Sequence, residues 1–335
     1  MTGVRKLVQA IDPYLLLLLG TVGLAALLPA TGAAATAVDG TATGAIALLF
    51  FLYGARLSTG EALAGIRHWR LHLTILTSTF VVFPLLGLAA WALVPWLLTE
   101  ELHTGLLFLC LVPSTVQSSI AFTSLARGNV AGAIAAGSFS SLLGILLTPL
   151  LAALLIGTSG GFTADSLVRI AAQLLLPFLA GQLSRRWIRG FLTRHRPVLG
   201  MVDRAAILVV VYAAFSQGVN EGIWSEVSWR RLLALGAVLA VLLAVLLGLT
   251  AWGAKRLGFV REDRITIILA GSQKSLAAGL PMAGVIFGAQ AAMAVLPLML
   301  FHQMQLIVCA VLARRWAKDP EGPDQLPPVD GSDSR

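Results

Sequence analysis

Polar side chains interrupt two apolar stretches of this chain, and one of those side chains is a lysine. The first interruption is Pro113-Ser114-Thr115-Val116-Gln117-Ser118-Ser119 and the second is Gly271-Ser272-Gln273-Lys274-Ser275. Hydroxyl and carboxamide groups can bind cations or polar solutes, and an ammonium group attracts anions. These residue types predict a site for a small charged solute. The candidate binding residues are Ser114, Thr115, Gln117, Ser118, Ser119, Ser272, Gln273, Lys274 and Ser275.

The remaining side chains argue against catalysis. The sequence contains no nucleophile with a placed base, no His/Asp/Glu cluster with metal-ligand spacing and no phosphate-binding loop. Cys110 and Cys309 both fall in apolar runs, so we interpret them as buried thiols rather than as a disulfide or a zinc site. We therefore predict that the protein is not an enzyme and holds no resident cofactor.

The composition requires a lipid environment for most of the chain. Of its 335 residues, 57% are hydrophobic and 12% are charged, whereas a soluble domain has about 25% charged residues. Too few polar side chains are present to cover a water-exposed surface of this size. The lipid bilayer is thus the first partner that the sequence implies.

Apolar runs of the length that crosses a bilayer occur ten times along the chain. Arg5 and Lys6 precede the first run as they would in a signal sequence, but the runs that follow make it more consistent with a first membrane helix. The predicted spans are 13–30, 43–57, 72–98, 104–126, 130–157, 166–184, 204–220, 231–254, 264–287 and 290–314.

The basic residues give this map an orientation. With the N-terminus in the cytoplasm, only Arg169, Arg230 and Arg231 of the 24 lysines and arginines fall outside, and Lys274 falls within a span. This distribution follows the positive-inside rule and predicts a multi-pass protein of the cytoplasmic membrane with both termini in the cytoplasm. The net charge of +8 therefore reflects topology and contact with anionic lipid, not nucleic-acid binding.

Ten spans divide into two sets of five, and an odd number of spans makes the two sets enter the membrane from opposite sides. Both polar interruptions fall in the fourth span of their set, and both contain Gln-x-Ser. Unwound backbone at membrane depth requires protein or a water-filled cavity around it, so paired breaks indicate a transporter site. We predict a first inverted repeat at 1–157, a second at 158–318, and a disordered cytoplasmic tail at 319–335.

Lys274 is the one charged residue that the map places deep in the membrane, about ten residues or roughly 15 Å into its span. Such a lysine costs about 2.5–3.5 kcal/mol on insertion, which makes it a functional residue by default. A charged Lys274 requires an anion, carbonyl oxygens or water, and an anionic solute is the simplest partner. The alternatives are a neutral amine that only hydrogen-bonds and a titrating amine that couples transport to protons. In the last span, His302 and Gln305 share a helix face.

The order of spans, the link Ala126-Arg127-Gly128-Asn129-Val130-Ala131 and the break at 271–275 resemble the bile acid:sodium symporter family, in particular its divergent symporter-like branch. The resemblance covers about residues 10–315. It implies ten helices in two inverted repeats. Spans one, two, six and seven would form a panel domain, and the other six spans a core domain. Broken spans four and nine would cross at mid-membrane, with sodium sites behind the crossing and substrate in front.

The resemblance carries over only in part to the sodium ligands. Leu269 stands where sodium-coupled members have a glutamate, and Ile120 where they have an asparagine. The fifth-span hydroxyl ligands fall near Ala133 and Gly137. Ser119 and Gln273 match ligand positions and remain the candidate sodium ligands. The family pattern therefore leaves two possibilities, that the Lys274 ammonium replaces the cation or that neutral oxygens bind it weakly.

Together, the residues and the resemblance predict a secondary active transporter that moves a small organic solute, expected to be anionic, by alternating access. Sodium and protons are both candidates for the coupling ion. A membrane regulator or receptor with a transporter fold and no net transport is the alternative. A channel is disfavoured because several spans lack a polar stripe. The sequence makes no prediction of oligomeric state.

Overall fold

In the computed structural model, residues 13–56, 68–157, 164–222 and 228–318 are described, and every regular element in these ranges is helical. The predicted tail at 319–335 lies outside the described residues. The first part of the chain forms α2 (Pro13–Leu27), α3 (Gly32–Arg56), α5 (Trp69–Thr77), the π-helix η2 (Ser78–Val82), α6 (Phe83–Ala89), the 3₁₀ helix η3 (Ala90–Leu93), α7 (Glu100–Leu111), α8 (Gln117–Leu125) and α9 (Val130–Leu155).

The second part of the chain is built in the same way. Its helices are α11 (Ala164–Arg194), α12 (Arg196–Asn220), α13 (Trp229–Arg256), α14 (Arg261–Gly271), α15 (Leu276–Phe287), the 3₁₀ helix η5 (Gly288–Gln290) and α16 (Ala291–Lys318).

Several helices have the length and composition of membrane spans. Within the described ranges, six are long and apolar enough to cross a bilayer: α3, the continuous run Trp69–Leu93, α9, α12, α13 and α16. Large apolar side chains such as Trp96, Leu183 and Trp187 are exposed on the outside of the bundle, as lipid contact requires. The chain is therefore a multi-pass membrane protein.

Each span predicted from the sequence falls on one helix or, at the two breaks, on a pair of helices, although three of the predicted limits were wrong by about two turns or more. The helix predicted to begin at residue 43 begins at Gly32, the helix predicted to end at residue 184 continues to Arg194, and the helix predicted to begin at residue 204 begins at Arg196. Small residues with Asp39 lower the hydropathy before residue 43, and four arginines lower it after residue 184. Neither kind of residue prevents helical hydrogen bonding, so the helix exceeds the apolar run.

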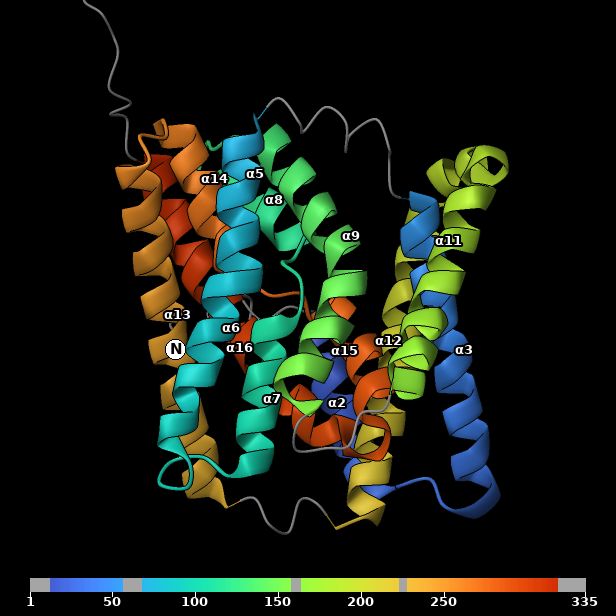
Figure 1. Ribbon diagram of the computed structural model, residues 1–335. Coiled ribbons are helices and arrows are strands. Elements are labelled where there is room, and N and C mark those ends of the chain that lie inside the picture. The colour runs from blue at the N-terminus through green and yellow to red at the C-terminus, as the bar shows by residue number, and fades with distance from the viewer. Residues whose placement is uncertain (1–12, 57–67, 158–163, 223–227, 319–335) are drawn as a thin grey trace, which may run out of the picture.

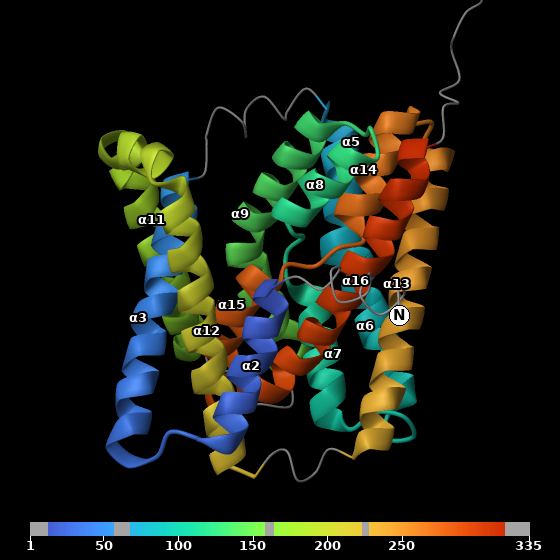
Figure 2. The ribbon, with the colours of Figure 1, turned by 180° about the vertical axis from the view of Figure 1, so that it is seen from behind.

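The helices form two groups. Helices α3, α11 and α12 lie at one side of the molecule, and α5, α13 and α14 at the other, in both views (Figures 1 and 2). Helix α2 packs on α12, while α16 packs on α7, α13 and α15. We call α2, α3, α11 and α12 the side group and the other described helices the central group. The two groups meet where α12 packs on α15 and α16, and where α11 packs on α9.

Two glycines allow α3 and α11 to pack closely within the side group. A Cβ atom at Gly54 would lie 2.0 Å from the Phe178 carbonyl oxygen, and one at Gly181 would lie 2.0 Å from the Phe51 carbonyl oxygen. Any other residue would clash with the facing backbone. Small residues at such a crossing let two membrane helices gain van der Waals contact without a hydrophobic driving force.

Candidate functional site

The first break in a helix is the segment 112–116 between α7 and α8. The last carbonyl groups of a helix have no partner within it, and in this segment other parts of the chain supply the partners. The Thr148 hydroxyl donates to the Leu111 carbonyl oxygen at 2.8 Å. The Ser140 hydroxyl accepts from the Ser114 amide at 2.9 Å. Both partners come from α9, so hydrogen bonds to this helix stabilise the unwound segment.

The second break is the segment 272–275 between α14 and α15. The carboxamide of Gln305, fully buried on α16, accepts from the Lys274 amide and donates to the Lys274 carbonyl, both at 2.8 Å. The Ser78 hydroxyl donates to the Gly271 carbonyl at 2.7 Å, and Ser272 donates to the Ile268 carbonyl at 2.6 Å. Gln305 therefore replaces the helical partners that Lys274 has lost.

The two breaks bind each other directly. The Ser275 amide donates to the Pro113 carbonyl at 2.9 Å, and the Ser114 hydroxyl donates to the Ala270 carbonyl at 2.5 Å. The Ser118 hydroxyl lies 2.7 Å from Gln273 Oε1 and 3.2 Å from Thr115 Oγ1. Segments more than 150 residues apart in the sequence are thus joined, and both breaks lie near the middle of the bundle in each view (Figures 1 and 2).

Lys274 is fully buried, and its ammonium nitrogen contacts three backbone carbonyl oxygens. Nζ lies 2.9 Å from Thr79 O, 2.8 Å from Cys110 O and 2.7 Å from Val112 O. It also lies 4.0 Å from the centre of the Phe83 ring. Of the partners considered for this lysine, the structure shows carbonyl oxygens. The side chain faces the interior of the central group.

The other predicted site residues differ in their accessibility. Gln117, the first residue of α8, is exposed, and Ser118 is half-buried. The remaining residues are buried: Ser114, Thr115, Ser119, Ser272, Gln273 and Ser275. The start of α8 and Ala277 in the first turn of α15 are therefore the exposed positions next to the two breaks.

Two buried polar atoms at the candidate sodium ligands have no hydrogen-bond partner in the described structure. They are the Ser119 hydroxyl oxygen and the Gln273 amide nitrogen. The Gln273 carboxamide oxygen already accepts from Ser118. The described residues form no group of three or more His, Cys, Asp or Glu that could hold a metal ion. A sodium ion here would therefore depend on neutral oxygens.

The link between α8 and α9 ties the first half of the chain to the start of α14. Arg127 adopts a left-handed backbone conformation with φ 59°, and the Asn129 side chain accepts from the Gly132 amide at 2.8 Å, capping α9. The same side chain donates to Asp263 at 2.7 Å. The sequence motif around Asn129 thus marks a tertiary contact as well as a turn.

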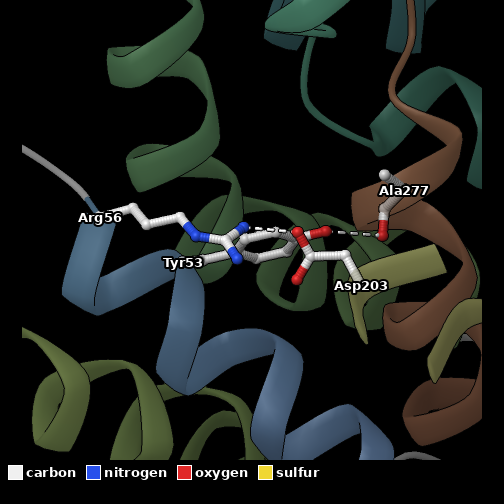
Figure 3. Close-up of polar contacts among 4 residues, drawn as sticks. All are labelled: Tyr53, Arg56, Asp203 and Ala277. Atoms are coloured by element: carbon white, nitrogen blue, oxygen red, sulfur yellow. Dashed lines mark hydrogen bonds and ion pairs between the residues drawn. The ribbon is translucent and has the colours of Figure 1, made fainter. Parts of the chain in front are cut away.

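Three polar side chains of the side group that are not among the residues predicted for the site lie opposite the start of α15 (Figure 3). The Tyr53 hydroxyl donates to the Ala277 carbonyl at 3.2 Å, and Arg56 forms an ion pair with Asp203. In the sequence, Arg56 and Asp203 stand at the ends of the predicted spans 43–57 and 204–220. Opposite charges at the edges of two apolar spans were the available signal, because charges there require a partner.

Comparison with known proteins gives matches over most of the chain. The profile of the SBF-like CPA transporter family matches residues 12–318, which include both breaks. PA2026 of Pseudomonas aeruginosa is 54% identical over 310 residues, or 92% of this chain and 93% of the relative. YfeH of Escherichia coli, named as a candidate symporter, is 48% identical over 319 residues, or 94% and 96% of the two chains. Sodium/bile acid cotransporter 7 of Mus musculus is 30% identical over 276 residues, or 80% of each chain.

Proposed function

The chain belongs to the SBF-like CPA transporter family, and from this premise we propose that it is a secondary active transporter that moves a small organic anion across the cytoplasmic membrane by alternating access. Membership confirms the resemblance predicted from the link at 126–131 and the break at 271–275. The names of two relatives are those of a symporter and a cotransporter, which supports the proposal of a transporter.

The observation that carries the proposal is the pairing of the two breaks. Helices α8 and α15 both begin at the break, and Ser275 and Pro113 join them at 2.9 Å. The first amides of a helix have no partner within it and carry a partial positive charge, which suits an anion. Irregular backbone at membrane depth is tolerated where it lines a cavity or binds protein, and transporter sites use this arrangement.

We further propose that the ten predicted spans form two inverted repeats, at 1–157 and 158–318, with the side group as the panel domain and the central group as the core domain. The similar order of elements supports this division, since α7-break-α8-α9 corresponds to α14-break-α15-α16. Both termini would then lie in the cytoplasm, as the distribution of arginine and lysine predicts.

The solute would lie between the panel and the core, in contact with Gln117, Ser118 and the first turn of α15. Arg56 faces this region from the side group, and about a third of its side chain is exposed. A guanidinium group matches the geometry of a carboxylate, sulfonate or phosphate. We propose that Arg56, held by Asp203, binds the anionic group of the solute. Lys274 would act from behind the site, through the backbone that it holds.

Coupling to a cation gradient completes the proposal, with sodium and protons as the two candidates. Relatives carry sodium in their name, and Ser119 and Gln273 provide the neutral groups that could contribute to such a site here. Leu269 is buried where the family resemblance implies an acidic ligand, so any sodium would bind without that carboxylate.

The test is uptake of radiolabelled organic anions by proteoliposomes that contain the purified protein. We expect uptake above that of empty liposomes, driven by an inward sodium gradient or a pH gradient. In the Arg56→Gln variant, apparent affinity should fall about tenfold or more, whereas Arg70→Gln, which removes a guanidinium bound to the Leu257 carbonyl, should match wild type. Saturable ligand binding without uptake under either gradient would instead support the receptor or regulator alternative.

A further inference from the structure

Within the described residues, the recorded hydrogen-bond partners of the Lys274 amine are all acceptors. Thr79, Cys110 and Val112 each present a backbone carbonyl oxygen within 2.9 Å, and a carbonyl oxygen only accepts. Three contacts to acceptors require three N–H bonds, which an ammonium group has and a neutral amine lacks. The geometry of the site is therefore that of a cation in a cage of oxygens.

The carbonyls of the cage are available because their own helices cannot use them. Cys110 belongs to the last turn of α7 and Val112 follows its end, where carbonyl groups have no helical partner. Thr79 lies in η2, where a carbonyl pairs with the amide five residues later. That residue is Pro84, which has no amide hydrogen, while the Phe83 amide donates to Ser78. All three oxygens are thus left without a backbone donor by local sequence.

The charge in the cage is balanced without a carboxylate. In the described part of the chain the recorded ion pair is Arg56–Asp203, and none involves Lys274. The carbonyl end of the α7 dipole and the face of Phe83, 4.0 Å away, supply the negative potential instead. A ring of backbone carbonyls that replaces the hydration shell is also how ion channels bind monovalent cations.

We infer that the carbonyls of Thr79, Cys110 and Val112 form a monovalent-cation site, and that Lys274 fills this site as a permanently tethered cation. In this position the ammonium binds the third span and the first break to the second break, which carries it. An exchangeable cation such as sodium has no room in the cage while Lys274 is present. The inference rests on the proposed function only where it places the cage in a transport site. The contacts that form the cage do not depend on any solute.

The experiment measures the thermal stability of purified protein in detergent, without any solute. Lys274→Ala removes three methylenes and the amine, which together correspond to n-propylammonium. In choline buffer we expect a Tm about 5 °C or more below that of wild type, because three buried carbonyls lose their donors. Addition of n-propylammonium or potassium should raise the Tm of this variant saturably and leave the Tm of wild type unchanged. Sodium is left out of this comparison, because the proposed coupling site at Ser119 and Gln273 would bind it in both proteins.

Two variants serve as controls. Lys255→Ala removes an exposed lysine at the end of α13, and its Tm should match that of wild type with or without the amine. Lys274→Met keeps most of the side-chain volume without the charge, so its Tm should be lowered and should not respond to n-propylammonium. If Lys274→Ala can be purified only in buffer that contains n-propylammonium, its Tm should fall when the n-propylammonium is removed.

The inference is overturned if Lys274→Ala or Lys274→Met is as stable as wild type in choline buffer. It is equally overturned if no cation raises the Tm of Lys274→Ala, because a cage without affinity for free cations is only a set of hydrogen bonds. Neither outcome affects the proposed transport, which is tested by solute uptake. Conversely, a failure to detect uptake would count against the proposed transport only. The cage would still be tested by the effect of cations on the Tm of Lys274→Ala.

Discussion

Ser118 on α8 donates a hydrogen bond to Gln273 of the second break, at 2.7 Å between the two side-chain oxygens. The two residues are separated by 155 positions in the chain, and each comes from the Gln-x-Ser motif of a different half. The contact lies between the exposed start of α8 and the fully buried carboxamide of Gln273. It therefore connects the exposed start of α8 with the buried interior in which the two breaks meet.

Loss of this contact should weaken both stability and transport. Ser118→Ala leaves the Gln273 carboxamide oxygen buried without a donor, at a cost of about 1–3 kcal/mol. We expect a lower Tm and reduced uptake of the solute. Ser124→Ala, at an exposed position on the same helix, is the matched control and should resemble wild type. An unchanged Tm in Ser118→Ala would show that the contact between the breaks adds nothing to the stability of the central group.

Gln305 should contribute as much to the stability of the protein as the residues of the second break do. Gln305→Leu leaves the Lys274 amide unpaired and the Lys274 carbonyl with only the longer contact to His302 Nδ1 at 3.3 Å, at a cost of about 2 kcal/mol or more. Gln305→Glu keeps an acceptor for the amide and loses the donor to the carbonyl, so its Tm should lie between those of the leucine variant and wild type. Gln303→Leu, on the same helix, is the control for the loss of a carboxamide. Equal Tm values for the leucine and glutamate variants would contradict the described pairing.

Tyr53 should influence the conformational equilibrium more than the stability. Its hydroxyl binds the side group to the start of α15, across the boundary along which the two groups would move. Tyr53→Phe removes about 1 kcal/mol from the conformation in which Gln117 is exposed, a shift of about fivefold in population.

The shift can be measured as the labelling rate of a Gln117→Cys variant by a thiol reagent, since both native cysteines are buried. We expect slower labelling when Tyr53→Phe is added. Tyr212→Phe provides the matched control, because Tyr212 donates to the Leu28 carbonyl at 2.8 Å within the side group. Identical labelling rates with and without Tyr53→Phe would show that the Tyr53 hydroxyl does not affect the conformational equilibrium.

The close crossing of α3 and α11 should tolerate no side chain. A Cβ at residue 181 would lie 2.0 Å from backbone, so Gly181→Ala should lower stability by about 1–3 kcal/mol as the helices separate. Gly190→Ala lies on the same helix with nothing within 4 Å of the added atom. Because glycine weakens a helix by about 0.5–1 kcal/mol relative to alanine, this control should be neutral or stabilising. Similar Tm values for the two variants would argue against the crossing.

Much of the architecture was predictable because the bilayer imposes simple rules on the sequence. An apolar run long enough to cross the membrane must form its backbone hydrogen bonds internally, so hydropathy alone predicted where the helices lie. Polar residues inside two such runs also predicted the breaks, at 113–119 and 271–275. The structure places the unwound segments at 112–116 and 272–275, with Gln117, Ser118 and Ser119 already in α8. The helix ends at Gly32 and Arg194 were missed, since a helix can continue beyond its apolar part.

The sequence by itself predicted a lysine deep in a membrane span and, through the family resemblance, a site without the usual acidic residue. It could not determine what the ammonium contacts, because an anion, water and carbonyl oxygens all satisfy a charge. Only the tertiary structure decided this, by bringing Thr79, Cys110 and Val112 within 2.9 Å of Nζ. The reason is physical: unpaired carbonyls arise from helix ends, a π-helix and a proline, and their positions relative to Lys274 depend on packing between distant segments. The same dependence on packing placed Tyr53 and Arg56 opposite α15 (Figure 3).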